Sequence, residues 1–152
     1  EANQIIKLAP DNANGWFLKG MALLELDRHD EGLHAFDQAI RLRPDMAEAW
    51  QGKGTCQVRL RRFEEALDAL ARAPYVYLVF YERGRALEGL GRYNEAMDAL
   101  HESIKINPDD RDILDSARAL LDSLAGRRQA PPSETRTVEP NTGEPHTYNS
   151  PS

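Results

Sequence analysis

The side chains that most often carry out chemistry are few and scattered in this sequence. Its histidines are His29, His34, His101 and His146, and its single cysteine is Cys56. No two histidines stand four residues apart with a third ligand nearby, which is the spacing that a zinc-binding helix needs. Gly89 and Gly91 alone are too few for a phosphate-binding loop. We therefore expect no catalytic residue, no metal, no cofactor and no enzyme activity.

The composition is that of an acidic globular chain. It has 152 residues, of which 41% are hydrophobic and 29% charged, and its formal net charge is -6. Because phosphate backbones are bound by clustered lysines and arginines, we expect no nucleic-acid partner. No apolar run reaches the roughly 18 residues that span a bilayer, so we expect no membrane partner and a cytoplasmic location. One thiol cannot form an internal disulfide, so nothing indicates an oxidised, secreted scaffold.

A set of aromatic and small residues recurs along the chain. Trp16 and Gly20 recur 34 positions later as Trp50 and Gly54, and a lysine directly precedes each glycine. A third copy follows 30 positions further on, where Phe80 takes the place of tryptophan. Sequence periods of this length are typical of arrays of small supersecondary units.

Each copy has the pattern of two helices. In its first half, apolar residues recur every three or four positions, as one face of a helix requires. A glycine inside a helix costs roughly 1 kcal/mol relative to alanine, so its recurrence there indicates close packing. The second halves begin with acidic residues, which favour the positive end of the helix dipole. Pro44 and Pro108 mark where second helices end.

The sequence resembles the tetratricopeptide repeat family over residues 3–125, because several residue types keep one register through three copies. Its Trp-x-x-Lys-Gly pattern is similar to repeats common in archaeal and cyanobacterial proteins. The resemblance implies an all-α fold, a right-handed α-solenoid of antiparallel helix pairs closed by a C-terminal capping helix. We expect a disordered tail after it, since that segment holds five of the nine prolines and no leucine or isoleucine.

The register predicts the boundaries of these units. We expect the end of a truncated preceding repeat at 1–10, repeat one at 13–46, a shortened repeat two at 47–76, repeat three at 77–110, a capping helix at 111–126 and the tail at 127–152. The capping helix is amphipathic and has no following partner, as the end of a repeat array requires. Gly126 is expected to end it.

The second repeat breaks the pattern. It is four residues shorter than the first, which is about one helical turn, and the loss falls near Ala73 and Pro74. The apolar run 75–81 follows at once and has the local preference of a strand, but Phe80 and Gly84 are in register and predict a helix for its later part. Either this run exposes an aromatic surface to a partner or a second copy, or its aromatics fill the space left by the missing turn.

The resemblance also implies that the first helices line a concave groove. The side chains that it assigns to this groove are Phe17, Met21, Leu24, Gln51, Thr55, Val58, Arg59, Leu78, Tyr81, Arg85 and Glu88. One end is apolar, the middle is polar, and the far end combines an aromatic ring with arginine. Such a face suits an extended or helical peptide with apolar anchors and an acidic group near Arg59 and Arg85. One subtype of the family clamps a chaperone's C-terminal carboxylate with Lys and Asn at these places, and because this sequence has Phe, Gln, Tyr, Met, Thr and Arg there, we do not expect that clamp.

The sequence thus predicts a module that binds a protein or peptide segment in the groove, as part of a larger scaffold or regulatory protein. Two alternatives stay open: a structural unit that self-associates into a homo-oligomer, and an accessory domain of a larger enzyme. The tail can also occupy its own groove or that of a neighbouring chain, because tethering gives it a high effective concentration there. The identity of the partner does not follow from the residues.

Overall fold

The computed structural model describes Gln4, Lys7 and residues 10–128. Within this part of the chain the backbone forms helices and connecting loops, and it contains no strand. The helices are α2 (Ala13–Glu25), α3 (His29–Leu42), α4 (Ala47–Arg59), α5 (Phe63–Leu70), α6 (Tyr77–Gly89), α7 (Tyr93–Ile106) and α8 (Arg111–Arg128). The predicted all-α fold is confirmed.

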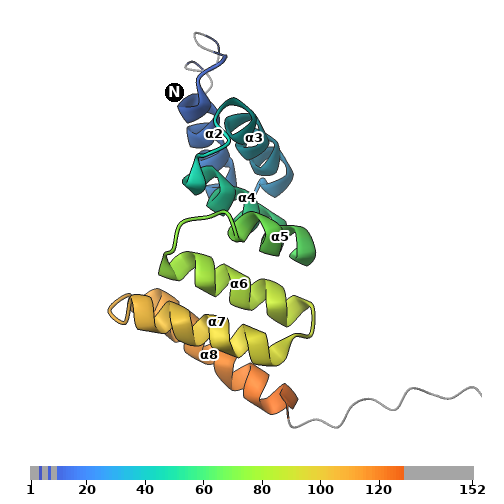
Figure 1. The fold of residues 1–152 in the computed structure, drawn as a ribbon, viewed down its shortest axis with the longest axis vertical. Helices are drawn as coiled ribbons and strands as arrows, with labels where there is room; N and C mark the ends of the chain where they lie inside the picture. The colour runs from blue at the N-terminus through green and yellow to red at the C-terminus, as the bar shows by residue number, and fades with distance from the viewer. Residues whose placement is uncertain (1–3, 5–6, 8–9, 129–152) are drawn as a thin grey trace, which may run out of the picture.

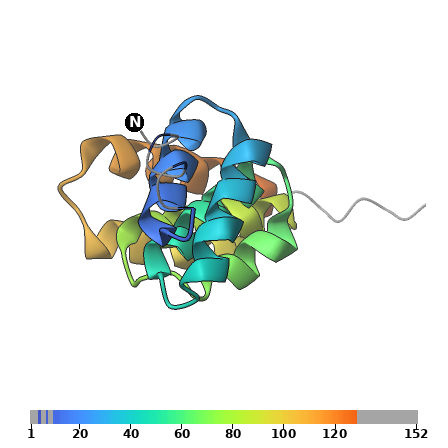
Figure 2. The same cartoon turned by 90° about the horizontal axis from the view of Figure 1, so that it is seen from above.

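The helices form antiparallel pairs that stack along the long axis of the molecule (Figure 1). α2 pairs with α3, α4 with α5 and α6 with α7, while α8 packs against α7. Each new first helix also contacts the preceding pair, since α4 packs on α2 and α3, and α6 packs on α4 and α5. Successive pairs are rotated relative to one another when the stack is seen from above (Figure 2). This is the arrangement of the predicted α-solenoid.

The two helices of each pair are joined by the same tight turn. One residue of the turn has a positive φ in every pair: Asp27 at 56°, Arg61 at 61° and Gly91 at 73°. The next amide donates back to the last turn of the first helix, as Arg62 N–H does to the Gln57 carbonyl at 2.8 Å. This is the hydrogen bonding of a Schellman motif, which closes a helix by satisfying its free carbonyls. The turn is therefore a property of the repeat itself.

The recurring glycines have the packing role that their register predicts. A Cβ on Gly54 would lie 2.6 Å from Cγ of Leu70, and a Cβ on Gly84 would lie 2.7 Å from Cγ of Leu100. Both leucines are buried, with 2% and 0% of their surface exposed. A side chain at either glycine would therefore push the two helices of its pair apart.

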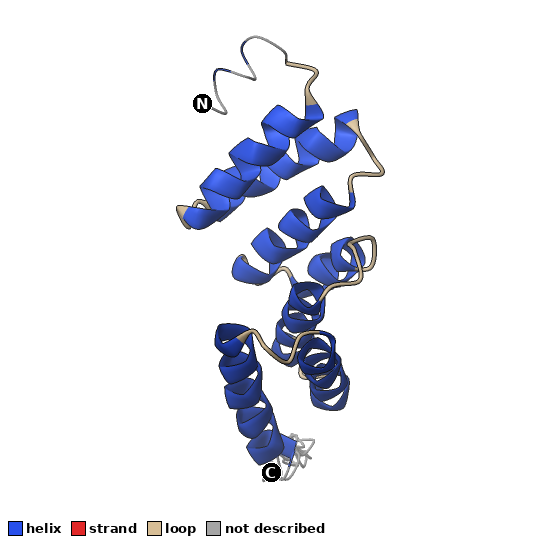
Figure 3. Ribbon diagram, turned by 90° about the vertical axis from the view of Figure 1, so that its left-hand side faces the viewer, coloured by secondary structure: helices blue, strands red, loops and turns tan. Residues whose placement is uncertain are grey.

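α5 is much shorter than the other second helices. It has 8 residues, whereas α3 has 14 and α7 has 14. The chain then runs through residues 71–76 without helical structure before α6 begins (Figure 3). The predicted loss of a turn is confirmed. The helix is even shorter than the four missing residues require, because the residues just before Pro74 have also left it.

The aromatic run after α5 is divided between core and surface. Val79 is buried, and the Tyr77 hydroxyl donates to Asp110 at 2.9 Å. Tyr75 is 69% exposed, and its ring packs edge-on against Phe80 with 4.7 Å between centroids. The run is helical from residue 77 onward, as the register predicts. Phe80 and Tyr81 are half-buried, while Tyr75 presents an exposed ring.

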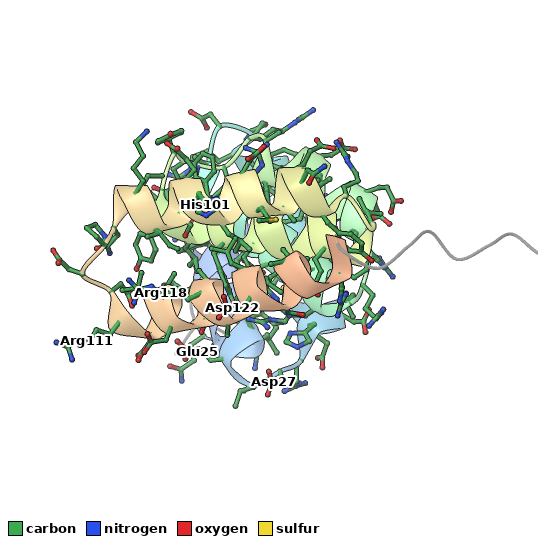
Figure 4. The ribbon with its side chains drawn as sticks, turned by 90° about the horizontal axis from the view of Figure 1, so that it is seen from below. Glu25, Asp27, His101, Arg111, Arg118 and Asp122 are labelled. Atoms are coloured by element: carbon green, nitrogen blue, oxygen red, sulfur yellow. The ribbon has the colours of Figure 1, made fainter. Side chains whose placement is uncertain are left out.

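α8 covers the C-terminal end of the stack. Ala117 and Leu124 are fully buried in the core that α8 shares with α6 and α7. Arg118 and Asp122 lie on its outer face at the end of the stack, where they are exposed to solvent (Figure 4). A polar outer face is what the last element of a repeat array needs. The helix continues to Arg128, two residues beyond its predicted end, because a glycine at 126 costs a helix only about 1 kcal/mol.

Two expectations fall almost entirely outside the described residues. They are the truncated repeat at 1–10 and the tail, whose residues 129–152 are not described.

Candidate protein-binding groove

The side chains assigned to the groove lie on α2, α4 and α6, and their exposure differs from helix to helix. On α2, Met21 is 37% exposed, whereas Phe17 and Leu24 are half-buried against the first core cluster. The Phe17 ring lies 6.0 Å from that of Phe36, between centroids. Leu18, on the same helix, is 49% exposed. α2 thus offers an apolar surface made mainly by Leu18 and Met21.

The middle of this face is more closed than the sequence predicts. Gln51 is half-buried, whereas Thr55 and Val58 are buried, with 8% and 3% of their surface exposed. Val58 packs with Ala66 and Ala86 in the core between the second and third pairs. Its role is to hold α4 and α6 together, and it presents almost no surface to a partner.

A pocket of about 690 Å³ opens where α4 and α6 end. The predicted groove residues that the structure brings together in its lining are Val58, Arg59, Arg85 and Glu88. Arg61 from the α4–α5 turn and Arg127 from α8 complete a set of four arginines. These four arginines create a local positive surface, although the chain as a whole carries a net charge of -6. Leu78 and Tyr81 lie half-buried on α6 outside this lining.

A buried carboxylate lies behind two of these arginines. Glu82 is 1% exposed, with Oε1 at 3.6 Å from Nη2 of Arg59 and Oε2 at 3.5 Å from Nη1 of Arg85. Within the described chain, Oε2 has no hydrogen-bond partner. Burial raises the pKa of Glu82, and the two arginines oppose that rise. Since both ion pairs are longer than a good hydrogen bond, the two guanidiniums keep N–H donors for an external oxyanion.

Sequence reasoning missed this carboxylate and two of the four arginines. Glu82 stands where the other two copies have the uncharged residues Leu18 and Gly52. This change to an ionisable residue was the signal in the sequence that could have revealed it. Arg127 reaches the pocket on α8, where Nη1 lies 3.2 Å from Oε1 of Glu88. Only the path of α8 across the end of the stack places it there.

The other groups with chemical potential are not arranged for reaction. Cys56 is fully buried, and burial raises the pKa of its thiol to about 12, as expected for an inert core cysteine. No three His, Cys, Asp or Glu side chains among the described residues gather in a way that suits a metal ion. Across the same residues, no helix combines the length and apolar character needed to cross a membrane.

Comparison with known families settles what kind of repeat this is. Two models, each described as Tetratricopeptide repeat, match the chain, one at residues 17–75 and the other at residues 77–110. The chain belongs to the tetratricopeptide repeat family. The first match runs from within α2 through α5, and the second covers α6 and α7. No curated protein matches the sequence of this tetratricopeptide repeat chain.

Solved tetratricopeptide repeat structures share the fold. YrrB, described as a TPR protein with an unusual peptide-binding site, is 20% identical with a TM-score of 0.69, over 84% of this chain and 66% of YrrB. The first TPR of Spaghetti (RPAP3), bound to the HSP90 peptide SRMEEVD, is 19% identical with a TM-score of 0.65, over 74% of this chain and 93% of that one. MamA 41-end from Desulfovibrio magneticus RS-1 is 17% identical with a TM-score of 0.67, over 86% of this chain and 84% of that one.

Proposed function

We propose that this tetratricopeptide repeat chain is a protein-interaction module that holds a segment of another protein along α2, α4 and α6. The observation that carries the proposal is the four-arginine pocket between the ends of α4 and α6. The four arginines line one cavity together with a single carboxylate, that of Glu88. Arginine is also enriched in protein interfaces, where its planar fork binds carboxylates in pairs of hydrogen bonds.

The two ends of the face define the segment that it suits. Leu18 and Met21 on α2 form an apolar contact surface, and Arg59 and Arg85 form a cationic one. A segment that reaches from one to the other needs an apolar side chain at one end and a carboxylate at the other. Thr55 and Val58 lie between these two surfaces and are buried, so the middle of the bound segment is held by backbone contacts and by shape.

Relatives with the same fold support this kind of ligand. YrrB is described by a peptide-binding site, and the RPAP3 repeat was solved with a peptide whose sequence, SRMEEVD, contains three acidic residues. An acidic peptide on a related repeat is consistent with an oxyanion at the arginine pocket. The four arginines of the pocket are an observation on this chain alone.

A capture experiment with the full chain tests the proposal. We expect the immobilised chain to retain a partner from its native lysate and to lose it when Arg59→Glu and Arg85→Glu are combined. Because these arginines flank buried Glu82, a second variant combines Arg61→Glu and Arg127→Glu, which lie outside that contact. Circular dichroism establishes that each variant remains helical.

The matched control combines Arg111→Glu and Arg118→Glu, which change the net charge equally on the exposed surface of α8 (Figure 4). Retention in this control and loss in both pocket variants would support the groove. A partner that binds folded pocket variants as well as the parent chain would contradict it.

Self-association is a second candidate, which the exposed side of α2 favours. Leu18 and Met21 on this helix are 49% and 37% exposed, and Leu26 directly after it is 64% exposed. Sedimentation velocity of the full chain over a hundredfold range of concentration tests it. A monomer throughout would exclude this function, whereas a dimer that Leu18→Glu and Leu26→Glu dissociate would establish it.

A further inference from the structure

The second and third helix pairs each have an outer cleft between their two helices. The cleft between α4 and α5 measures about 250 Å³, and that between α6 and α7 about 490 Å³. The linings correspond residue by residue with an offset of 30: Trp50 to Phe80, Lys53 to Arg83, Asp68 to Asp98 and Arg72 to Glu102. The larger cleft is therefore the same site in a later repeat with different contents. It lies on a face of α6 other than the one that carries Tyr81, Arg85 and Glu88.

The smaller cleft already contains a guanidinium of its own. Arg72 lies over the Trp50 ring, with Cζ at 4.6 Å from the centroid. Lys53 lies over the same ring with Nζ at 5.4 Å. Carboxylates of Glu65 and Asp68 line the same cleft. The second repeat thus places two cations on one aromatic ring beside two acids, which is a stable arrangement for arginine.

The larger cleft has the ring and the acids but has only one cation over the ring. Arg83 takes the role of Lys53, with Cζ at 5.4 Å from the Phe80 centroid. At the position of Arg72 stands Glu102, so an acid replaces the guanidinium and the cleft is about twice as large. Asp98 is exposed and has no ion-pair partner in the described part of the chain.

Glu102 is held ready as an anion at the edge of the cleft. The Tyr75 hydroxyl donates to its Oε1 at 2.5 Å, and exposed Lys105 places Nζ at 3.5 Å from its Oε2. The hydrogen bond from Tyr75 and, after it, the charge of Lys105 lower the pKa of Glu102. Tyr75 packs edge-on against Phe80, so it extends the aromatic surface up to the carboxylate. Arg92 also lines the cleft, where its Nε and Nη2 donate to the two carboxylate oxygens of Glu95 at 2.8 and 2.6 Å.

We propose that the cleft between α6 and α7 binds an arginine side chain of a partner protein, which takes the place that Arg72 has in the preceding repeat. The guanidinium stacks on Phe80 beside Tyr75 and donates to Asp98 and Glu102. The apolar stem of the arginine lies against buried Leu87 at the floor of the cleft. This site does not depend on the groove proposed above, because it uses another face of α6.

A nuclear magnetic resonance titration of the full chain tests the site with a single arginine. The probe is N-acetyl-arginine methylamide, and the matched control is N-acetyl-citrulline methylamide, which has the same shape without the charge. We expect saturable shifts at residues 75, 80, 98 and 102, with a dissociation constant on the order of 1 mM for one side chain. We expect citrulline to bind at least fivefold more weakly, since it lacks the charge-assisted hydrogen bonds.

Variants separate binding in this cleft from general attraction to an acidic chain. The double variant Asp98→Asn with Glu102→Gln should bind the arginine probe at least fivefold more weakly. Glu64→Gln, which changes an exposed acid on α5, should leave the affinity for the probe unchanged. Glu102→Arg restores in cis the residue type found at position 72, so the variant should stay folded and should no longer bind the probe.

The proposal is overturned if arginine and citrulline probes bind equally, if no shift occurs at 20 mM probe, or if Glu102→Arg binds like the parent chain. If dilution of the unliganded chain moves the same resonances, the cleft is filled by an arginine of a second copy, and the assignment to a different partner is wrong.

Discussion

Gly52 and Phe36 are in direct contact across the junction between the first two helix pairs. A Cβ on Gly52 would lie 2.5 Å from Cε1 of Phe36, and a Cβ on Gly20 would lie 2.8 Å from the same atom. Phe36 is fully buried. One ring therefore fills the gap within its own pair and the gap to the next pair, so packing inside and between repeats depends on the same side chain.

Replacing Gly52 by alanine should lower the free energy of unfolding by about 1 to 3 kcal/mol, as expected for an overpacked core. The better helix propensity of alanine, about 1 kcal/mol, offsets only part of this loss. Urea unfolding followed by circular dichroism measures it. Gly126→Ala is the control, because nothing lies within 4 Å of its Cβ, and it should leave stability unchanged or raise it. In the double variant with Phe36→Leu, the loss of stability should be smaller than the sum of the losses of the two single variants, since the smaller side chain makes room for the new methyl group.

The positive-φ position of the helix-to-helix turn leads to a second prediction. Gly91→Ala should destabilise the chain by about 1 kcal/mol although nothing lies within 4 Å of the new Cβ, because the backbone there has φ of 73°. Arg61→Gly should be neutral or stabilising at the equivalent turn, where arginine now has φ of 61°. Thermal unfolding of both variants tests this, and a stabilising Gly91→Ala would show that the turn relaxes to another conformation.

The fold was predictable from the sequence because its signals are local and repeated. The Trp, Gly and Pro positions set helix faces, close contacts and helix ends in each copy, and the structure has helices where these signals predict them. The shortening of α5 was visible as a change of spacing. The final length of α5 was not, because a proline restricts the residue before it without fixing how many further residues leave the helix.

The candidate site was predictable only in part. Arg59 and Arg85 follow from helix periodicity, since both lie on the face that the repeat register assigns to the groove. Val58 lies on the same predicted face, yet it is buried because α6 packs against α4 at that height. Burial of Glu82 has the same cause. Such contacts between neighbouring helices depend on the distance and rotation between repeats, which a one-dimensional pattern does not contain.

Cys56 gives a third prediction, which concerns reactivity. Its thiol is buried and, with a pKa of about 12, remains protonated at pH 8. Because the thiolate is the reactive form, a disulfide reagent such as Ellman's reagent should label the native chain at least about a hundredfold more slowly than the unfolded chain in urea. Cys56→Ser with Ser116→Cys moves the thiol to the exposed surface of α8 and should react at once. Rapid labelling of native Cys56 would show that α4 opens readily.

Glu82 gives the fourth prediction, in which stability depends on pH. Burial raises the pKa of its carboxyl above the ordinary value of 4.5, so the folded chain holds a proton that the unfolded chain releases. Below pH 4.5 both states carry this proton and Glu82 has no penalty. As the pH rises from about 4.5 through the folded pKa, the chain loses stability. Glu82→Gln has no proton to release and should avoid that loss.

The free energy of unfolding of Glu82→Gln should therefore equal that of the parent chain near pH 4 and exceed it by about 1 to 2 kcal/mol at pH 8, the scale seen when buried ionic groups are replaced by neutral ones. Urea titrations at unit steps of pH measure the difference. Glu95→Gln is the contrasting variant, because the hydrogen bond from Arg92 lowers the pKa of that exposed carboxyl. Glu95→Gln should therefore be less stable than the parent chain above pH 4.5, and this difference should vanish in acid. If Glu82→Gln instead proves less stable at pH 8, the attraction of Arg59 and Arg85 outweighs the cost of burial, and Glu82 is charged in the folded chain.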